Sequence, residues 1–513
     1  MSNSSRKQNS INLITNLLAF VINAGINFFL TPYLLEQLGT ESYGFIGLAN
    51  DFVGYANIFA MALNTMSGRF IAVSYHRGEK EKANRYMNSV FMANVILGAV
   101  VALAGVFIVW KLEYIINIPT YLISDVKITF ALVFANYLLS IIISVLNCAP
   151  FIKNKMDLVY IRNIISYLIK LIFTIGLLML FDIKIYIISL VTLICTVYLM
   201  VANGVIFRKL LPEFRLSSKG FSLAMIKEIL SSGIWMSLLS LSNLLLSGLN
   251  SLLTNKFISP VAMGYLNVSK TIPNYISQLG QQLGTVFAPE FTKHYAEGEI
   301  DTLISEAKKA IKIMSFIMIV PVAGFIVFGN EFYTLWLKDY TADEISTIQA
   351  LSVIITVPYL INGIIYPLVQ IHNALNKIKL PVIATFIIGI INILIILPLG
   401  SFNKLTLITL TVSSSVLQCL RNAVFQPIYA AKILKQKWYI FVLTELKYFL
   451  VFGGISLLFY VGKSFTNISS WLTFIIWIAV FAVMGYAVLS LIIFSRSEIK
   501  ELLSSVKSKI KRQ

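Results

Sequence analysis

Fourteen long apolar segments follow one another along this chain of 513 residues, and the lysines and arginines gather in every second loop between them. A helix needs about 20 apolar residues to cross the roughly 30 Å of hydrocarbon in a bilayer, so each segment is long enough to span it. Composition agrees, because 58% of the residues are hydrophobic and only 12% are charged, too few to cover a soluble body of this size. The sequence therefore predicts an all-α integral membrane protein with 14 transmembrane helices. The predicted spans cover residues 10–33, 43–72, 87–110, 121–149, 157–181, 184–207, 222–253, 260–291, 303–329, 345–375, 380–400, 402–432, 440–462 and 469–495.

The basic residues predict the orientation of these spans. About 29 of the 41 lysines and arginines fall in loops and tails on one side and about 7 on the other, and cytoplasmic loops are the ones that retain Lys and Arg. We therefore expect a multi-pass protein of the cell (cytoplasmic or inner) membrane with both termini cytoplasmic. The first span is too long for a signal peptide, and no small-residue cleavage site follows it. The same bias explains the net charge of +18, so membrane lipids are expected partners and nucleic acid is not.

Motifs for catalysis or metal binding are missing from the sequence. Cys148, Cys195 and Cys419 lie inside or at the end of spans, in no metal-ligand spacing, and are interpreted as packing residues. The sequence contains no phosphate-binding glycine loop, no paired histidine motif and no soluble segment large enough for an ATPase. We therefore expect no cofactor, no metal and no enzyme activity.

The two halves of the chain repeat each other at an offset of 220 residues. Gly44 matches Gly264, and each enters an even-numbered span from outside. The further matches are Asn23 with Asn243, and Tyr75, Gly78 and Glu79 with Tyr295, Gly298 and Glu299. Six spans in each repeat preserve direction, so the halves are expected to be parallel repeats related by a pseudo-twofold axis along the membrane normal. The predicted domains are an N-terminal six-helix bundle (1–215), a C-terminal six-helix bundle (216–437) and an extra helix pair with a basic tail (438–513).

Several short motifs carry a resemblance to a known family. They are Leu38–Phe45, Gly68–Phe70 and His76–Glu79 in the first half, and Ser259–Val268 and Ala288–Glu290 in the second. With them the chain resembles, over essentially its whole length, the polysaccharide transporter family, the Wzx-type flippases. This family belongs to the MOP superfamily, together with multidrug and toxin extruders and MurJ-type lipid II flippases.

The resemblance implies the transport of a lipid-linked sugar. The expected substrate is a polyprenyl-pyrophosphate oligosaccharide repeat unit, moved from the cytoplasmic to the outer leaflet by alternating access. The product would serve the assembly of a surface polysaccharide, which could be O-antigen, capsule, exopolysaccharide or a teichoic-type polymer. Candidate further partners are H+ or Na+ as a coupling ion and a polysaccharide polymerase.

Cationic side chains within the spans are candidates for binding the pyrophosphate. Arg162 and Lys170 lie two turns apart on one face of the fifth span, Arg421 lies in the twelfth span and Lys270 in the eighth. Charges at this depth usually face a wet cavity or a partner, and arginine suits phosphate oxygens. We therefore predict a cationic cavity. Arg162, like Arg69, could instead anchor a helix end at the interface.

Three further features concern gating and selectivity. Lys270 corresponds, at the 220-residue offset, to position 50, which is next to Asp51. These two residues are therefore a candidate gate ion pair near the outer mouth. Pro273, Pro358 and Pro367 each remove a backbone hydrogen bond and are candidate helix bends, either mobile or static. The neutral polar candidates for sugar recognition are Asn27, Asn57, Asn64, Asn250 and Gln278.

Three alternatives remain open. An ion-coupled multidrug or toxin extruder of the same fold would favour an acidic cavity, but cations outnumber Asp51, the clearest acid within a span. A lipid II flippase would share the fold. A membrane-embedded glycosyltransferase or polymerase would need a larger outer loop than residues 330–345, whose acids Glu331, Asp339, Asp343 and Glu344 could form a rim for docking a partner.

Overall fold

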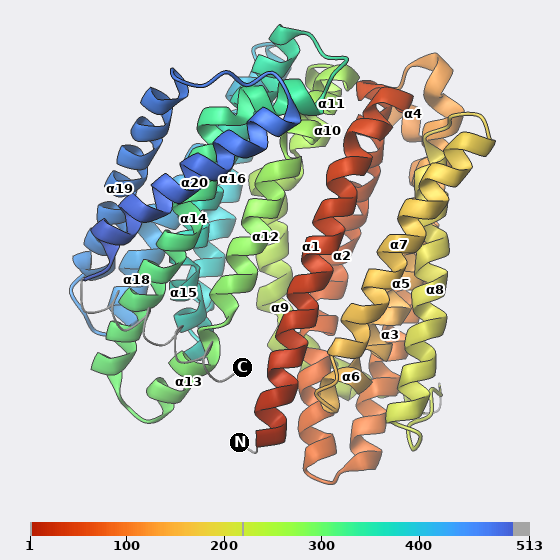
Figure 1. Cartoon of the computed structure of the whole chain (residues 1–513). Coiled ribbons are helices and arrows are strands. Elements are labelled where there is room, and N and C mark those ends of the chain that lie inside the picture. The colour runs from red at the N-terminus through yellow and green to blue at the C-terminus, as the bar shows by residue number, and fades with distance from the viewer. Residues whose placement is uncertain (1–2, 218–219, 496–513) are drawn as a thin grey trace. The chain divides into compact units, whose positions relative to one another are not determined.

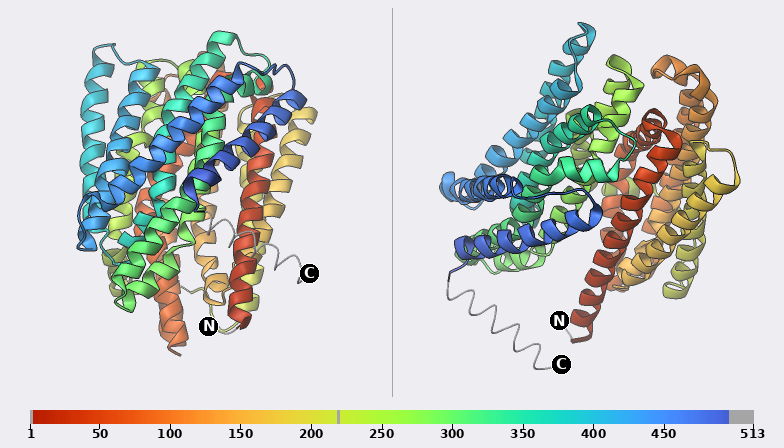
Figure 2. Two further views of the ribbon diagram at one scale, coloured as in Figure 1. Left: turned by 60° about the vertical axis from the view of Figure 1, so that its left-hand side comes forward. Right: turned by 45° about the horizontal axis from the view of Figure 1, so that its top comes forward.

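The computed structural model describes residues 3–217 and 220–495, and all regular secondary structure in this part of the chain is helical (Figures 1 and 2). It contains 12 candidate spans that are long and apolar enough to cross a membrane. The predicted all-α membrane fold is confirmed. Of the 14 predicted spans, the eighth and the twelfth are the two that are absent from these 12.

The helices pack into two compact units. The first comprises residues 1–267 and 385–407, and the second comprises residues 268–384 and 408–513. The first contains α1 (Asn3–Leu38), α2 (Thr40–His76), α3 (Lys80–Trp110), α4 (Leu112–Ile115), η1 (Thr120–Leu122), α5 (Ile123–Leu146), α6 (Cys148–Ile152), α7 (Asp157–Leu180), α8 (Tyr186–Leu210), α9 (Leu223–Asn243), the π-helical η3 (Leu244–Gly248), α10 (Asn250–Phe257), and most of α11 (Pro260–Ser269) and α16 (Lys379–Ser401). The second contains α12 (Thr271–Thr285), α13 (Ala288–Ala296), α14 (Ile300–Trp336), α15 (Ala342–Ala374), α17 (Leu407–Cys419), the π-helical η4 (Leu420–Phe425), α18 (Gln426–Ile433), α19 (Tyr439–Lys463) and α20 (Trp471–Ile493).

These units follow packing and not the sequence repeat. In the first unit α9 packs along α2, although they belong to different repeats. In the second unit α14 packs against α15, α19 and α20, around the largest buried apolar cluster. The predicted domains (1–215, 216–437 and 438–513) were derived from the sequence repeat, whereas these two units are defined by helix contacts. The domain boundaries therefore remain a prediction.

The eighth predicted span is divided into three helices, α11, α12 and α13. Lys270 lies in the turn between α11 and α12, and Pro273 follows in the first turn of α12. Pro289 likewise lies at the start of α13. Proline lacks a backbone N–H and its ring collides with the carbonyl four residues earlier, but the first turn of a helix tolerates both effects. Each proline therefore begins a new helix.

The twelfth predicted span is divided as well, into α17, η4 and α18. Its middle part winds as a π-helix, and Pro427 lies in the first turn of α18. A π-helical turn accommodates an extra residue within a helix and is frequent at functional sites. Together with the divided eighth segment, this arrangement is consistent with fourteen crossings.

The backbone supports the internal repeat. Gly78 and Gly298, 220 residues apart, have φ angles of 82° and 76°, in the left-handed region that favours glycine. In the first turn the Glu79 amide donates to the Ser74 carbonyl at 3.0 Å, and in the second the Glu299 amide donates to the His294 carbonyl at 2.9 Å. The same turn therefore ends α2 and α13, as the sequence match predicts.

Candidate functional site

Helix α2 carries a row of exposed residues along one face, and all of them except one glycine are polar. The row, here called the α2 stripe, consists of Asn50, Gly54, Asn57, Thr65 and Arg69. Their spacings of three, four and eight residues place them on a single side of the helix. The hydrocarbon core offers no hydrogen-bond partners, so a polar row on a spanning helix faces water or protein. The predicted sugar-binding candidate Asn57 lies on this stripe.

Helix α12 carries a matching row in the second unit. The α12 stripe consists of the exposed residues Asn274, Gln278, Gln281 and Thr285. The opposite side is buried against α15, where a Cβ added to Gly280 would lie 3.0 Å from the Gly363 Cα. The two stripes share two pairs of repeat mates, because Gly54 and Thr65 of α2 correspond to Asn274 and Thr285 of α12. The predicted candidate Gln278 lies on this stripe.

The other predicted polar candidates have neighbours of their own within the first unit. Asn27 donates to the Asn23 carbonyl at 2.8 Å, one turn earlier on α1. Asn64 accepts from Asn94 Nδ2 at 2.9 Å, within the packing of α2 on α3. Asn250 is buried at the start of α10. Of the five candidates, Asn57 and Gln278 are the two that lie on the stripes.

At the predicted outer end of the first unit, α2 crosses α11 at residues that are repeat mates. A Cβ added to Gly264 would lie 2.3 Å from the Thr40 carbonyl oxygen, and one added to Gly44 would lie 3.0 Å from the Gly264 Cα. Asn267 fills the next position by packing on Gly47 and donating to the Gly44 carbonyl at 3.1 Å. Gly44 contacts Gly264 and Gly47 contacts Asn267, each pair 220 residues apart, so the two repeats meet here at equivalent positions.

A pair of asparagines holds the same end of the unit together. The Asn117 amide donates to Asn255 Oδ1 at 2.8 Å, and Asn255 Nδ2 donates to the Asn117 carbonyl at 3.0 Å. This reciprocal pair, here called the asparagine clasp, joins the loop after α4 to α10. One level deeper, the Tyr55 hydroxyl donates to the Gly248 carbonyl at 3.0 Å. Three successive contacts therefore tie the first repeat to the start of the second.

The two predicted gate residues lie near these contacts along the chain. Asp51 precedes Tyr55 by one turn on α2, and Lys270 occupies the turn between α11 and α12. They belong to different units, so the gate ion pair remains a prediction.

Arg162 and Lys170 both lie on α7 and approach α8. Arg162 is near Tyr198, and its Nη1 is buried without a hydrogen-bond partner among the described residues. Lys170 is near Cys195, and no carboxylate in the described part of the chain pairs with it. A guanidinium nitrogen and an ammonium without an acceptor are what an anionic ligand would need.

Arg421 lies in the π-helical η4 of the second unit. Its Nε donates to Asn422 Oδ1 at 3.0 Å, and Asn422 Nδ2 donates to the Pro358 carbonyl on α15 at 3.2 Å. The structure therefore connects two predicted residues, Arg421 and Pro358, through an asparagine that the sequence had not singled out. Pro358 and Pro367 are both buried within α15, which is assigned as one helix throughout.

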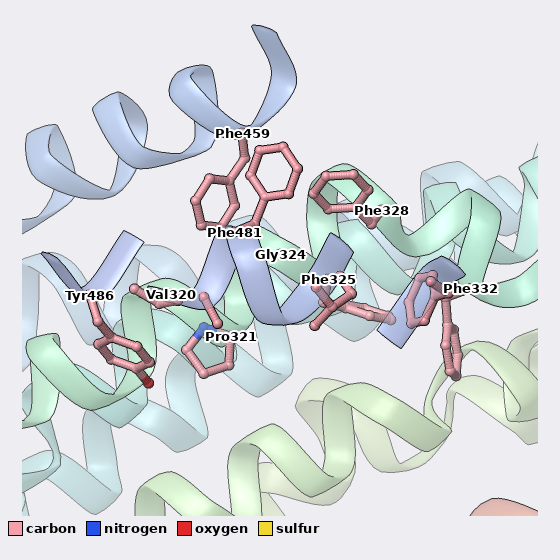
Figure 3. A pocket seen from close by; sticks show the side chains of 12 residues that line it. Val320, Pro321, Gly324, Phe325, Phe328, Phe332, Phe459, Phe481 and Tyr486 are labelled. Carbon is pink, nitrogen blue, oxygen red and sulfur yellow. The ribbon is translucent and has the colours of Figure 1, made fainter. Parts of the chain in front are cut away.

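An apolar pocket of about 310 Å³ opens between α14, α19 and α20 (Figure 3). Phenylalanine rings dominate its walls, and Pro321 and Gly324 of α14 also line it. A Cβ added to Gly324 would meet nothing within 4 Å. Beyond the pocket Lys463 Nζ pairs with Glu331 Oε1 at 2.6 Å. Glu331 therefore fastens α14 to α19, and the docking rim around residues 330–345 remains a prediction.

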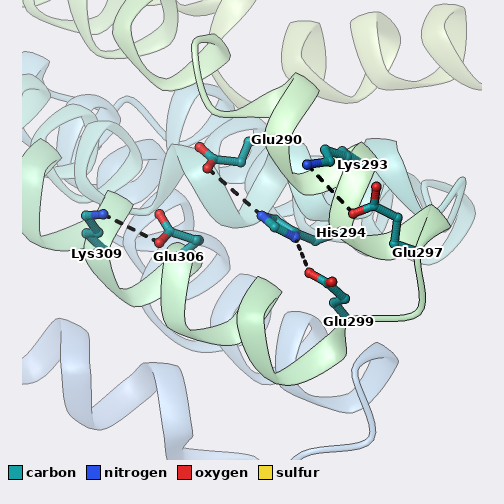
Figure 4. A network of polar contacts seen from close by, with 7 residues as sticks. All are labelled: Glu290, Lys293, His294, Glu297, Glu299, Glu306 and Lys309. Carbon is teal, nitrogen blue, oxygen red and sulfur yellow. Dashed lines mark hydrogen bonds and ion pairs between the residues drawn. The ribbon is translucent and has the colours of Figure 1, made fainter.

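The turns at the predicted cytoplasmic ends of α2 and α13 are held by polar side chains. His294 Nδ1 lies 2.8 Å from Glu299 Oε2, and its Nε2 lies 4.0 Å from Glu290 Oε1 (Figure 4). Ligand atoms of His294, Glu297 and Glu299 come within 4.8 Å of one another, a group that could hold a metal, although no metal was expected.

In the first unit Tyr75 donates to Glu213 Oε1 at 3.1 Å, and Lys80 Nζ lies 3.5 Å from the same oxygen. The pKa of Glu213 is lowered, chiefly by its own backbone N–H and further by Tyr75 and Lys80.

Sequence reasoning missed two buried titratable residues. Glu445 of α19 is 2% exposed, and His372 of α15 is also 2% exposed and makes an edge-to-face contact with Tyr429 at 5.0 Å between ring centroids. Glu445 falls within the predicted thirteenth span, so Asp51 was wrongly taken as the clearest acid in a span. A single acid inside an apolar run was the available signal.

Known proteins resemble this chain in sequence and in fold. The family model described as polysaccharide biosynthesis protein matches residues 11–295. The chain is 28% identical over 434 residues to the uncharacterized membrane protein EpsK of Bacillus subtilis (strain 168), covering 84% of this chain and 85% of that protein.

Two solved structures share the fold. The lipid II flippase MurJ in an inward closed conformation has a TM-score of 0.65 and 15% identity, covering 93% of this chain and 97% of that one. An inward-facing multidrug resistance MATE family transporter of the MOP superfamily has a TM-score of 0.62 and 15% identity, covering 84% and 99%.

Proposed function

The chain belongs to the family of polysaccharide biosynthesis proteins, and from this premise we propose that it is a flippase for a polyprenyl-pyrophosphate-linked oligosaccharide. The substrate moves from the cytoplasmic to the outer leaflet by alternating access of two six-helix bundles. No chemical step is required, so the protein is not an enzyme. The product supplies the assembly of a surface polysaccharide, in which a polymerase is the next partner.

The observation that carries this proposal is the pair of repeat-related stripes on α2 and α12. The spanning helix α2 and the helix α12 of the divided eighth segment expose polar residues that lipid cannot satisfy. Their members are mostly neutral amides and hydroxyls, which suit sugar hydroxyls because they donate and accept hydrogen bonds without a net charge. A pathway for a cationic drug would favour acidic residues at these positions. The stripes therefore support a carbohydrate.

Cations are proposed to bind the pyrophosphate. Arg162, Lys170 and Arg421 carry this role, and Lys270 is a fourth candidate at the break between α11 and α12. An anion that leaves a negative cell interior gains about 2.3 kcal/mol per charge for each 100 mV. The membrane potential therefore contributes to export without nucleotide hydrolysis.

The phenylalanine-lined pocket is proposed to hold part of the polyprenyl chain. It lies between the extra helix pair, α19 and α20, and α14, and its lining is apolar. An isoprenoid tail remains in a lipid-like environment there while the sugars follow the stripes. The gate is proposed at the crossing of α2 and α11, where the glycine contact and the nearby asparagine clasp join the two repeats within the first unit. Asp51 and Lys270 are proposed as a further ion pair of this gate.

The test is complementation of a deletion strain in which no other flippase serves the same polymer. Wild-type protein is expected to relieve the accumulation of lipid-linked oligosaccharide on the cytoplasmic side, whereas Lys170→Ala and Arg421→Ala are not, at matched expression. Lys338→Ala, which removes a charge from an exposed loop, is the control and should complement. If the deletion strain accumulates lipid II instead, or no lipid-linked sugar at all, the proposed substrate is wrong.

A second experiment tests the pocket. Gly324→Leu places a side chain in the open space of the pocket, while Gly453→Leu adds the same side chain to an exposed position on α19. Transport of a substrate with a full-length polyprenyl chain is expected to fall several-fold in the first variant and to stay normal in the second. Equal transport by both variants would remove the pocket from the pathway.

A further inference from the structure

Glu445 is a carboxylic acid buried in the apolar interior of the second unit. It lies on α19 between Phe441 and Tyr448, which belong to the cluster shared by α14, α19 and α20. Its side chain is 2% exposed, and neither carboxyl oxygen has a hydrogen-bond partner in the described residues 3–217 and 220–495. A buried glutamate with a structural role is normally hydrogen-bonded, so its position calls for another explanation.

Charged and titratable groups on the neighbouring elements interact elsewhere. On α14, Lys309 pairs with Glu306, Glu331 pairs with Lys463 and Lys312 lies over the ring of Phe494. Tyr429 of α18 donates to the Lys377 carbonyl, Arg421 of η4 donates to Asn422 and Tyr486 of α20 donates to the Ile317 carbonyl. On α19 itself, Lys447 lies over the ring of Tyr448. Tyr333 of α14 shares a hydrogen bond with Ser352, and Lys437 lies over the ring of Tyr439 on α19. The remaining groups on these elements are Asp301 and Lys308 on α14, Lys432 on α18 and Tyr460 on α19, and no ion pair joins any of these described groups to Glu445.

The free-energy cost of burying Glu445 depends on whether its carboxyl group is protonated. An ionised carboxylate removed from water costs several kcal/mol unless a cation or several donors compensate it. The protonated acid has no net charge, so it loses much less on burial. A sodium ion would need several oxygen ligands around it, as hard cations do, and the surroundings of Glu445 are apolar. The site therefore fits H+ and not Na+.

We propose that Glu445 is a proton-binding site that couples H+ to transport. The carboxyl holds a proton when α19 is packed as described, and it releases that proton to water when α19 moves and the carboxyl becomes hydrated. One O–H bond forms and breaks in each cycle. The inference rests on the proposed flippase function for its coupling, but proton binding itself can be tested without transport.

The first test is labelling with dicyclohexylcarbodiimide, an apolar reagent that modifies protonated carboxyls in membranes. The peptide containing Glu445 is expected to be modified, and the modification is expected to fall several-fold when the medium is made strongly alkaline. Glu445→Gln should abolish the modification of this peptide. The absence of modification at every pH would overturn the proposal.

The second test measures transport in proteoliposomes with an imposed proton gradient. The wild-type protein and the control Glu297→Gln, which changes an exposed acid in the turn after α13, are expected to flip substrate several-fold faster with the gradient. Glu445→Gln should flip at one rate with and without it, and should keep the wild-type thermal unfolding midpoint. A full response of Glu445→Gln to the gradient would overturn the coupling role. If the wild type flips no substrate while Glu445 still labels, the proposed function fails and proton binding stands.

Discussion

Helix α2 and its repeat mate have the same ends and a different interior. α2 runs unbroken from Thr40 to His76, and the mate, residues 260–296, begins and ends at the same positions plus 220 but is divided into α11, α12 and α13. The mate has Pro273 and Pro289 where α2 has Val53 and Arg69. The shared glycine turns set the ends, and the prolines set the continuity. The first repeat therefore has one continuous helix here, while the second has two helix breaks, which lie beside the positions equivalent to Val53 and Arg69.

The largest expected effect comes from placing in α2 the proline that its repeat mate has at the equivalent position. Val53→Pro removes a hydrogen bond in the middle of a continuous helix and should lower the free energy of unfolding by about 3 kcal/mol or more. Thermal unfolding in detergent and the yield of folded protein measure this effect. The reverse change, Pro273→Val, lies in a first turn and should leave the protein folded. Equal stability of both variants would contradict the assignment of the helix break to proline.

A smaller effect is expected at the crossing of α2 and α11. Gly264→Ala places a methyl group 2.3 Å from the Thr40 carbonyl oxygen, a backbone atom, whereas Gly44→Ala places one 3.0 Å from the Gly264 Cα. Overpacking of this kind costs about 1 to 3 kcal/mol, so we expect Gly264→Ala near the upper end and Gly44→Ala near the lower. Unfolding midpoints of the two variants, compared with Gly25→Ala in open space, provide the measurement. A larger loss of stability in Gly44→Ala than in Gly264→Ala would contradict this prediction.

One residue of the α12 stripe can be exchanged with its repeat mate on α2. Gln281→Met gives α12 the residue that α2 has at Met61, and Met61→Gln does the opposite. Losing an amide that binds a sugar hydroxyl should reduce transport about threefold to tenfold, because a hydrogen bond contributes roughly 0.5 to 1.5 kcal/mol. Stability should change little, since Gln281 is exposed. Normal transport by Gln281→Met would exclude this residue from the pathway.

The smallest effect concerns the turn that ends α2. The pKa of Glu213 is lowered in the folded protein, chiefly by its own backbone N–H. Its contribution to stability is therefore present above the unfolded pKa and is lost as the pH falls through the lowered folded value, at acidic pH. The exposed ion pair of Glu213 with Lys80 contributes at most about 1 kcal/mol to the free energy of unfolding. Unfolding midpoints of wild type and Glu213→Gln should differ slightly at neutral pH and converge in acid; a constant difference would refute the assignment.

Hydropathy predicted the spanning helices well where they are uniform. The eleventh span, expected at 380–400, is α16 at Lys379–Ser401. Hydropathy failed to predict continuity, because it averages over a window and Pro273 changes the backbone without changing the average. The π-helical segments were also invisible, since an extra residue in a helix depends on packing such as the Asn422 contact with Pro358. Local composition fixes where a span lies, and tertiary contacts decide how it winds.

The candidate site was predictable only in part. Asn57 and Gln278 were selected as polar residues within spans, yet the stripes became visible only when the structure distinguished exposed from buried faces. Glu445 was missed because one acid among about twenty apolar residues hardly alters a hydropathy sum. The positions of Lys170, Arg421 and the gate pair relative to one another depend on how the repeats meet, which no local pattern in the sequence encodes.

The contact between Gly44 and Gly264 has a consequence for how such a chain evolves. A residue that touches its own repeat mate is no longer free to change alone, because the space for its side chain is set by the other copy. After an ancestral duplication these two positions would have had to drift as a pair, while Val53 and Pro273 diverged. In an alignment of relatives we therefore expect small residues at both positions of the crossing. We also expect the sequence similarity between the two repeats to have been lost first in the helix interiors.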